Sequence, residues 1–428
     1  MKKNRLLTLG AVLAFALFFT ACSNPAGNGA EDNNDPDVTY FSISDDEEWI
    51  DALAVIRAGG NDMNYVINIT DNFSVQASTA NTFGTATGIS VTIRGNSTLS
   101  LDRTSEFGNL LRVGSGQTVV LHNTGLTGIS TFVNVSLVNV TGSGASFIMQ
   151  GNASVSGNNA HFGGGVYVTG SGASFTMRGN SSVSGTNSRF GGGVYVSSGA
   201  SFTMQDNASV FNNSATNGGG VYASGAIIMQ DRAQVHGNNA ADNGGGLYIT
   251  GTLTMLGNAS VARNVAHFGG GVFNRGTVTM QGNTSIYGNN AVDGGGASTV
   301  GAFTMQDSAS INNNDATSHF SSTYGGGVFI GRNAVFTMRG NTTVYGNTAN
   351  QGGGGVSIND GVFRIAGGLV YGSEASARYR NRARVGEALF LSSGLAGFGT
   401  FDAGGSWIGG GNISTRDDTI RVVNGELQ

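Results

Sequence analysis

The stretch that decides the fold is Gly191-Gly192-Gly193-Val194-Tyr195-Val196, a glycine triplet followed by a short run with apolar and aromatic residues. Similar stretches recur about every 27 residues along the chain. They begin at Gly163, Gly191, Gly218, Gly244, Gly269, Gly294, Gly325 and Gly352. A repeat of this period predicts a solenoid, in which each unit packs only on its neighbours.

Two further segments complete each repeat. One alternates apolar and polar residues, as in Phe202-Thr203-Met204-Gln205, which is the pattern of a strand with one buried face. The other places Val or Ile three residues before Asn, as in Val210 and Asn213. Three short strands per unit are too few for a propeller blade, and no helical period appears. We therefore predict an all-β parallel β-helix of about 11–12 coils, each with three strands.

The residue after the alternating segment is Gly or Asp, and Gly or Asp at this position predicts a turn with positive φ. Asp206 and Asp231 fall in adjacent coils, which makes them candidates for a shared cation. The turn already explains both residues, as it does Asp307, so we predict no metal site. Asparagines usually follow and are expected to stack as a hydrogen-bonded ladder. They are Asn152, Asn180, Asn207, Asn258, Asn283 and Asn341.

We expect five segments along the chain. Residues 1–21 form a lipoprotein signal peptide and residues 22–37 a flexible tether. Residues 38–64 form an N-terminal cap with a short helix, in which Ser44 and Glu47 make a capping box and Trp49, Leu53 and Ile56 share one face. The β-helix repeats occupy residues 65–370, and irregular C-terminal coils and a cap occupy residues 371–428.

The N-terminus has the features of a secretion signal. Lys2, Lys3 and Arg5 precede an apolar run that ends in Phe19-Thr20-Ala21-Cys22. This ending resembles a bacterial lipobox, which implies that Cys22 is lipidated and that the protein is held at the outer membrane or cell surface. Cys22 is the only cysteine in the chain. The alternative is an ordinary signal peptide with an incidental cysteine.

The composition argues against some classes of function. Without Lys2, Lys3 and Arg5 the chain has 18 arginines, no lysine and 26 acidic residues, a net charge of −8. This balance disfavours nucleic-acid binding, which needs a basic surface. The glycine triplets lack the Lys-Ser/Thr of a phosphate-binding loop, and we predict no cofactor.

The pairing of [Val/Ile]-x-x-Asn with a downstream Gly-Gly-Gly-Val is similar to the FxxN and GGA[I/L/V] repeats of the polymorphic outer-membrane proteins. The match covers residues 147–370, and Val or Ile stands where that family has Phe. The resemblance implies a right-handed β-helix displayed on a bacterial surface and a role in adhesion. The pattern resembles spirochaete-type lipoproteins with β-helix repeats still more closely.

An enzyme is the alternative function, because many β-helices are polysaccharide lyases or glycoside hydrolases. A lyase needs a base and carboxylates that hold Ca²⁺, and a hydrolase needs convergent carboxylates. Asp417 and Asp418 form the only acidic pair late in the chain, and a turn explains them. We therefore favour a non-catalytic protein and assign no catalytic residues.

Two groups of residues are candidate contact sites. Arg378, Arg380, Arg382 and Arg384 alternate, and in a strand they would form one basic face for an anionic ligand. Aromatic residues that point outward from the triplet strands form the second group, a possible contact stripe. They are Tyr167, Tyr195, Tyr222, Tyr248, Phe273 and Phe329. Expected partners are the membrane, through the lipid, and a glycan or an extracellular protein.

Overall fold

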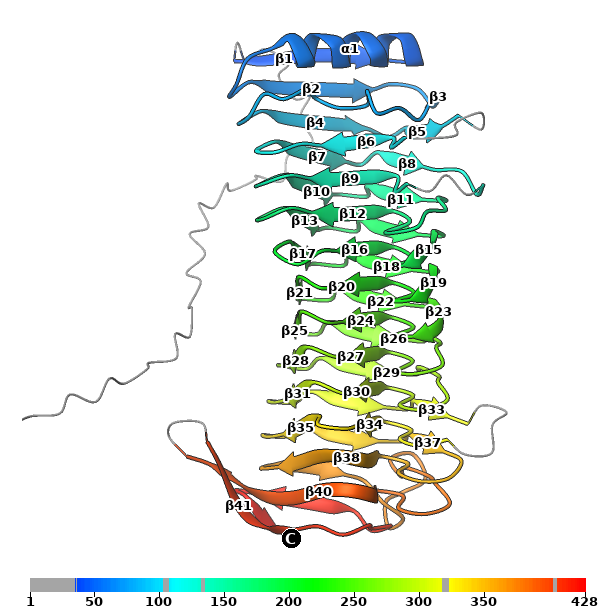
Figure 1. Ribbon diagram of the computed structural model, residues 1–428, viewed down its shortest axis with the longest axis vertical. Helices are drawn as coiled ribbons and strands as arrows, with labels where there is room; N and C mark the ends of the chain where they lie inside the picture. Colours follow the sequence, from blue (N-terminus) through cyan, green and yellow to red (C-terminus); the bar gives the residue numbers. More distant parts are fainter. Residues whose placement is uncertain (1–34, 36, 103–107, 132–134, 318–322, 403–405) are drawn as a thin grey trace, which may run out of the picture. The chain divides into compact units, whose positions relative to one another are not determined.

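The computed structural model describes residues 35, 37–102, 108–131, 135–317, 323–402 and 406–428. The expected signal peptide, Cys22 and nearly all of the tether lie outside these residues. The compact unit Pro36–Gln428 is a parallel β-helix of about 12 coils stacked along one axis, and its described residues contain one helix (Figure 1). The predicted fold is confirmed. No helix in the described part of the chain is long and apolar enough to cross a membrane.

The first face of each coil, the methionine face, is formed by the strands of the alternating segment. Every neighbouring pair on this face from β1 (Val38–Ile43) to β35 (Val335–Met338) is parallel and in register, so Met177, Met204 and Met229 lie on adjacent rungs. The strands are β2 (Asn64–Ile69), β4 (Ser90–Gly95), β7 (Thr118–His122), β10 (Ser146–Gln150), β13 (Ser174–Met177), β17 (Ser201–Met204), β21 (Ala226–Met229), β25 (Thr252–Met255), β28 (Thr277–Met280), β31 (Ala302–Met305) and β35 (Val335–Met338).

The second face, the triplet face, is formed by the strands that follow the glycine triplets. They are β6 (Leu111–Val113), β9 (Val138–Thr141), β12 (Val166–Thr169), β16 (Val194–Val196), β20 (Val221–Ala223), β24 (Leu247–Ile249), β27 (Val272–Asn274), β30 (Ala297–Thr299) and β34 (Val328–Ile330). The long strand β38 (Val356–Ile365) pairs with both β34 and β35 and so joins the triplet and methionine faces.

The third face, the serine face, lies ahead of the asparagines. Its strands are β3 (Phe73–Val75), β5 (Thr98–Leu101), β8 (Gly125–Thr127), β11 (Ser154–Ser156), β14 (Ser182–Ser184), β18 (Ser209–Phe211), β22 (Gln234–His236), β26 (Ser260–Ala262), β29 (Ser285–Tyr287), β32 (Ser310–Asn312), β36 (Thr343–Tyr345) and β39 (Gly368–Val370). Short strands run along the ridge between the serine and triplet faces. They are β15 (Asn187–Phe190), β19 (Ser214–Asn217), β23 (Asn239–Asn243), β33 (Asp315–Ala316) and β37 (Thr348–Ala349).

The bore of the solenoid is one continuous apolar core. Equivalent side chains of successive coils stack on each other, and the rings of Phe147, Phe175 and Phe202 follow at centroid distances of 5.4 and 4.8 Å. Met204 of the methionine face and Val210 of the serine face are fully buried in this core. The inward and outward sides of each strand therefore match the period-two pattern of the sequence.

Each glycine of a triplet is needed for a different reason, as Gly218–Gly220 illustrates. Gly218 has a φ of +66°, which favours glycine. A Cβ on Gly219 would lie 2.5 Å from the carbonyl oxygen of Asn239 in the next coil. A Cβ on Gly220 would lie 2.9 Å from both the Asn238 amide nitrogen and the Val235 side chain. The coils thus approach each other too closely at this corner for any side chain.

The positive φ of the first triplet glycine shows that one repeat begins at another residue than predicted. Four glycines stand at 352–355, and Gly353, with a φ of +67°, is the structural equivalent of Gly218. The eighth triplet therefore begins at Gly353 and not at Gly352.

Asparagines form two ladders. The predicted one lies at the exposed turn, where Nδ2 of Asn207 donates to Oδ1 of Asn180 at 3.2 Å. The second ladder is buried and was not predicted, although its asparagines are those of the [Val/Ile]-x-x-Asn motif. Its members in succession are Asn213, Asn238, Asn264, Asn289, Asn314, Asn347 and Asn381. The buried ladder gives polar partners to the backbone at a corner that has no access to water.

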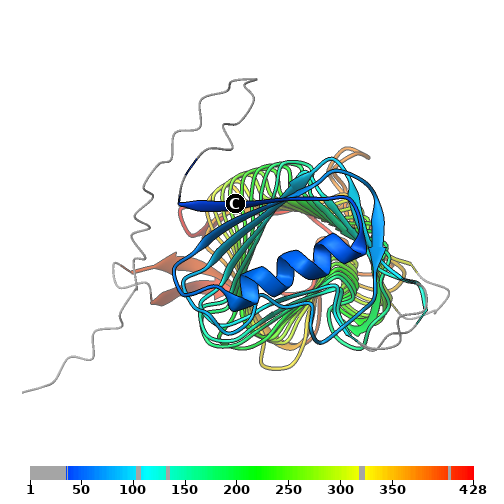
Figure 2. The ribbon, with the colours of Figure 1, turned by 90° about the horizontal axis from the view of Figure 1, so that it is seen from above.

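The helix α1 (Asp46–Ala58) covers the N-terminal end of the core (Figure 2). Trp49, Leu53 and Ile56 are buried on one face, as predicted. The predicted capping box is wrong by one residue, because the N-cap is Asp45, whose carboxylate accepts from the backbone N–H of Glu48 at 2.9 Å. The Glu48 carboxylate in turn accepts from the backbone N–H of Ser44 at 2.7 Å.

The C-terminal end is closed by strands that reverse direction. In the sheet of the methionine face, β40 (Leu389–Phe401) is followed by the antiparallel strand β41 (Trp407–Asn412). On the serine face, β42 (Ile420–Val423) runs antiparallel to β39, and β43 (Glu426–Leu427) antiparallel to β42. This reversal ends the parallel stacking that the repeats would otherwise continue.

Candidate functional site

The triplet face carries a row of five neighbouring aromatic rings on its outer side, of which Tyr248 is buried and the other four are half-buried. These residues, which we call the aromatic stripe, are Tyr167, Tyr195, Tyr222, Tyr248 and Phe273. Their centroids follow one another at 5.3, 5.0, 4.7 and 5.2 Å, since each residue occupies the same position in its coil. The rings of Tyr195 and Tyr222 are nearly parallel, with an interplanar angle of 2°, whereas those of Tyr167 and Tyr195 are tilted by 48°.

From Tyr195 to Phe273 neighbouring rings are stacked, so a partner would meet ring edges and the phenol groups of the tyrosines that are not buried. Burial is the main influence on the pKa of the Tyr195 and Tyr222 hydroxyls, and hydrogen bonding with the Ser224 side chain acts in the opposite, lowering direction. Burial raises the pKa of both phenols above the usual value, and neighbouring tyrosines shift the pKa in the same direction. Tyr195 and Tyr222, which are half-buried, therefore present protonated hydroxyl groups that donate and accept hydrogen bonds at neutral pH.

Two phenylalanines on the adjoining ridge widen the stripe. Phe162 and Phe190 stack at 5.5 Å, and each meets a stripe ring edge-on, Phe162 at Tyr195 and Phe190 at Tyr222. Phe162 is 39% exposed. Sequence reasoning missed both residues, although each directly precedes a glycine triplet and so recurs at a fixed repeat position.

A shallow hollow of about 460 Å³ lies on the same ridge. Its lining comprises Asn159, Ala160, Asn187, Ser188, Arg189, Ala215 and Thr216. The guanidinium of Arg189 lies 5.2 Å from the centre of the Phe190 ring. The Ser188 hydroxyl is buried, and no hydrogen-bond partner for it exists among the described residues. The stripe is thus bordered by a hollow whose lining includes the guanidinium group of Arg189 and the Ser188 hydroxyl, which has no described partner.

Phe329, the sixth residue of the predicted stripe, does not join the row. Ser298 occupies the rung between Phe273 and Phe329, and Ser357 occupies the rung beyond Phe329. The aromatic stripe therefore ends at Phe273.

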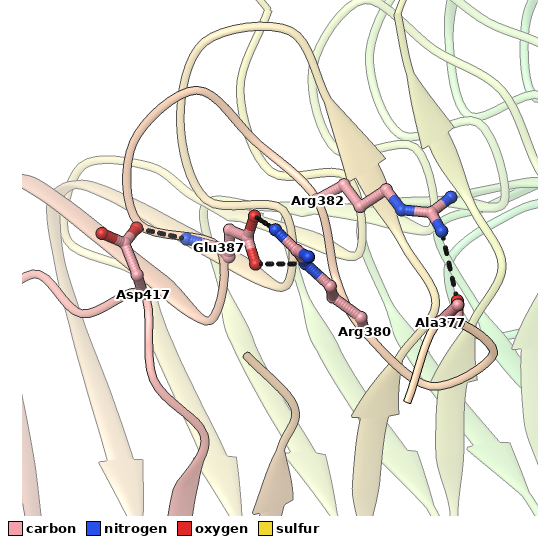
Figure 3. A network of polar contacts seen from close by, with 5 residues as sticks. All are labelled: Ala377, Arg380, Arg382, Glu387 and Asp417. Carbon is pink, nitrogen blue, oxygen red and sulfur yellow. Dashed lines mark hydrogen bonds and ion pairs between the residues drawn. The ribbon is translucent and has the colours of Figure 1, made fainter. Parts of the chain in front are cut away.

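The segment that contains the four arginines is an irregular loop rather than a strand (Figure 3). Arg380 is held by the Glu387 carboxylate through two contacts, one of 2.7 Å from its Nε, and this ion pair raises the pKa of Arg380. The backbone N–H of Glu387 donates to the Asp417 carboxylate at 3.1 Å. Arg382 donates to the carbonyl oxygen of Ala377 at 3.2 Å. The Arg380 side chain therefore forms a structural ion pair with Glu387.

The remaining arginines are exposed. Among the described residues, no ion pair joins Arg378, Arg382 or Arg384 to an acidic side chain. These three, unlike Arg380, are placed to meet an anion from solution.

The acidic candidates have structural contacts. Asp206 and Asp231 have φ values of 56° and 58°, and each carboxylate accepts a backbone N–H of the preceding coil, at 2.8 and 3.1 Å. Asp307 does the same for Gly282 at 2.9 Å. Asp418 lies 3.9 Å from Arg416. Within the described ranges, no three His, Cys, Asp or Glu side chains are grouped so that they could hold a metal ion.

Comparison with known proteins gives no relative to set beside this geometry. The chain matches no protein-family model, no curated protein and no solved structure.

Proposed function

We propose that this protein is a lipid-anchored, non-catalytic β-helix of the bacterial surface that binds an extracellular glycan or protein through the aromatic stripe and the adjoining ridge. The observation that supports this most is the row of neighbouring aromatic rings from Tyr167 to Phe273 beside the exposed Phe162 ring. Partly exposed tyrosines with apolar rings and polar tips are enriched at protein interfaces.

The regular coil supports a role in contact rather than catalysis. The residues of the stripe repeat at the spacing of the rungs, which suits an extended partner that lies along the axis. The carboxylates most suggestive of chemistry, those of Asp206, Asp231 and Asp417, each accept a backbone N–H. These contacts explain their positions without a substrate.

The surface location rests on the lipobox-like segment and Cys22. In a Gram-negative host, Cys22→Ala and treatment with globomycin should each abolish partitioning of the protein into the Triton X-114 detergent phase, because both prevent formation of the mature lipidated cysteine. Ser23→Ala, a neighbouring change, should partition like the wild type. Detergent-phase recovery of Cys22→Ala would refute the anchor.

The binding role predicts that Tyr195→Ala/Tyr222→Ala weakens binding to the ligands that the wild-type protein retains on an array of glycans and matrix proteins. The expected loss is about tenfold or more, since two central interface tyrosines are removed. Tyr287→Ala is the matched control, because Tyr287 lies on the serine face. Equal binding by the stripe variant and the control would contradict the proposal.

The enzyme alternative is tested on the same preparation. Incubation with polyuronates should produce no absorbance from unsaturated uronate and no new reducing ends. Turnover that survives repurification would overturn the non-catalytic assignment.

A further inference from the structure

An insertion in one late coil builds a second aromatic group on the serine face. In the regular coil, Tyr345 and one further residue separate Val344 from the ladder residue Asn347. In the next coil the equivalent positions are Val370 and Asn381, as the pairing of Val344 with Val370 and of Asn347 with Asn381 shows. Residues 372–379 are therefore additional to the repeat.

Both ends of this insertion are held by hydrogen bonds. The Asn381 amide donates to the carbonyl oxygen of Tyr371 at 2.6 Å. The backbone N–H of Gly346 donates to the carbonyl oxygen of Tyr379 at 2.9 Å. The first bond closes the loop on itself, and the second holds Tyr379 against the preceding coil.

The insertion completes a group of three rings, which we call the tyrosine cluster: Tyr345, Tyr371 and Tyr379. Tyr379 lies 5.5 Å from Tyr345 and 5.6 Å from Tyr371, and Tyr345 lies 6.2 Å from Tyr371. Tyr345 and Tyr371 are half-buried, whereas Tyr379 is 38% exposed. The contacts of Tyr379 are not part of the repeat structure, because Tyr379 has no equivalent in the other coils.

Two arginines place positive charge beside the tyrosine cluster. The Arg378 guanidinium lies 5.6 Å from the centre of the Tyr379 ring, and Arg382 reaches the same loop at the carbonyl oxygen of Ala377. Glu387 is occupied by Arg380, and Glu374 is exposed on the insertion. The chain as a whole has a net charge of −5, but at this point an exposed arginine lies over an exposed ring. This local pairing is complementary to an anionic ligand.

We propose that the tyrosine cluster, together with Arg378 and Arg382, binds an anionic sugar unit of an acidic glycan. The apolar side of a pyranose would pack on the Tyr379 ring, and a carboxylate or sulfate group would accept hydrogen bonds from the guanidinium groups. This site lies on a different face from the aromatic stripe and adds a ligand class to the proposed binding function, on which it does not depend.

Two probes test the site, a heparin-derived hexasaccharide and a hexamer of galacturonate, whose acidic groups are only carboxylates. The wild-type protein should bind at least one of them, and Tyr379→Ala and Arg378→Gln should each weaken that binding by about tenfold. Tyr379→Phe should retain it, because the ring is what packs. Which probe binds distinguishes sulfate from carboxylate recognition. Absence of binding to both probes would overturn the proposal.

Three controls test whether the sugar binds at the tyrosine cluster itself. Arg332→Gln removes an exposed arginine that pairs with Asp360 elsewhere on the solenoid. This variant should leave binding of the sugar probes unchanged. Tyr195→Ala/Tyr222→Ala should also leave it unchanged, so failure of the stripe and failure of this site are distinguishable. Binding of polyglutamate with equal affinity, unaffected by Tyr379→Ala, would show general charge attraction and would refute a sugar site.

Discussion

Met204→Asp is expected to unfold the central coils. Met204 is fully buried in the bore, where its rung is paired with Met177 and Met229. A carboxylate there would have no polar partner and would cost about 4 kcal/mol or more. Because each coil packs on its neighbours alone, the loss should spread to adjacent coils before it reaches the ends.

Urea unfolding followed by far-UV circular dichroism, with native-state hydrogen exchange of the central coils, measures this effect. Thr203→Asp is the matched control, since Thr203 is the adjacent residue of β17 and lies on the outer side. It should shift the unfolding midpoint only slightly. Equal stability of the two variants would contradict the assignment of inward and outward residues.

Asn238→Ala is expected to destabilise the solenoid by about 2–4 kcal/mol. Oδ1 of Asn238 accepts from both the backbone N–H and the side-chain amide of Asn213, each at 3.0 Å. Its Nδ2 donates to the carbonyl oxygen of Val210 at 3.1 Å and to Oδ1 of Asn264 at 3.0 Å. Alanine removes all four bonds and leaves buried backbone groups without partners.

Asn207→Ala provides the comparison, because Asn207 belongs to the exposed ladder and water can replace its lost contact. Thermal and urea unfolding of both variants should give a large effect at Asn238 and a small one at Asn207. Similar midpoints would show that the buried ladder does not stabilise the corner as its geometry indicates.

The period of the glycine triplets, read with the alternation of residues such as Phe202 and Met204, determined the solenoid, its inward residues and the alignment of the aromatic stripe. The physical reason is that equivalent residues of a parallel β-helix must lie one rung apart, so repeat alignment predicts which side chains stack. The helix α1 was also readable, because Trp49, Leu53 and Ile56 follow a helical period.

Only the tertiary structure decided contacts between residues at different repeat positions. Phe162 meets Tyr195 of the next coil, and Tyr379 meets Tyr345 because an insertion folds onto the preceding coil. Arg380 is removed from the predicted basic patch by Glu387, seven residues away. Such contacts depend on the loop conformation, and the repeat period does not specify loop conformation, since its regularity constrains the strands and the corners alone.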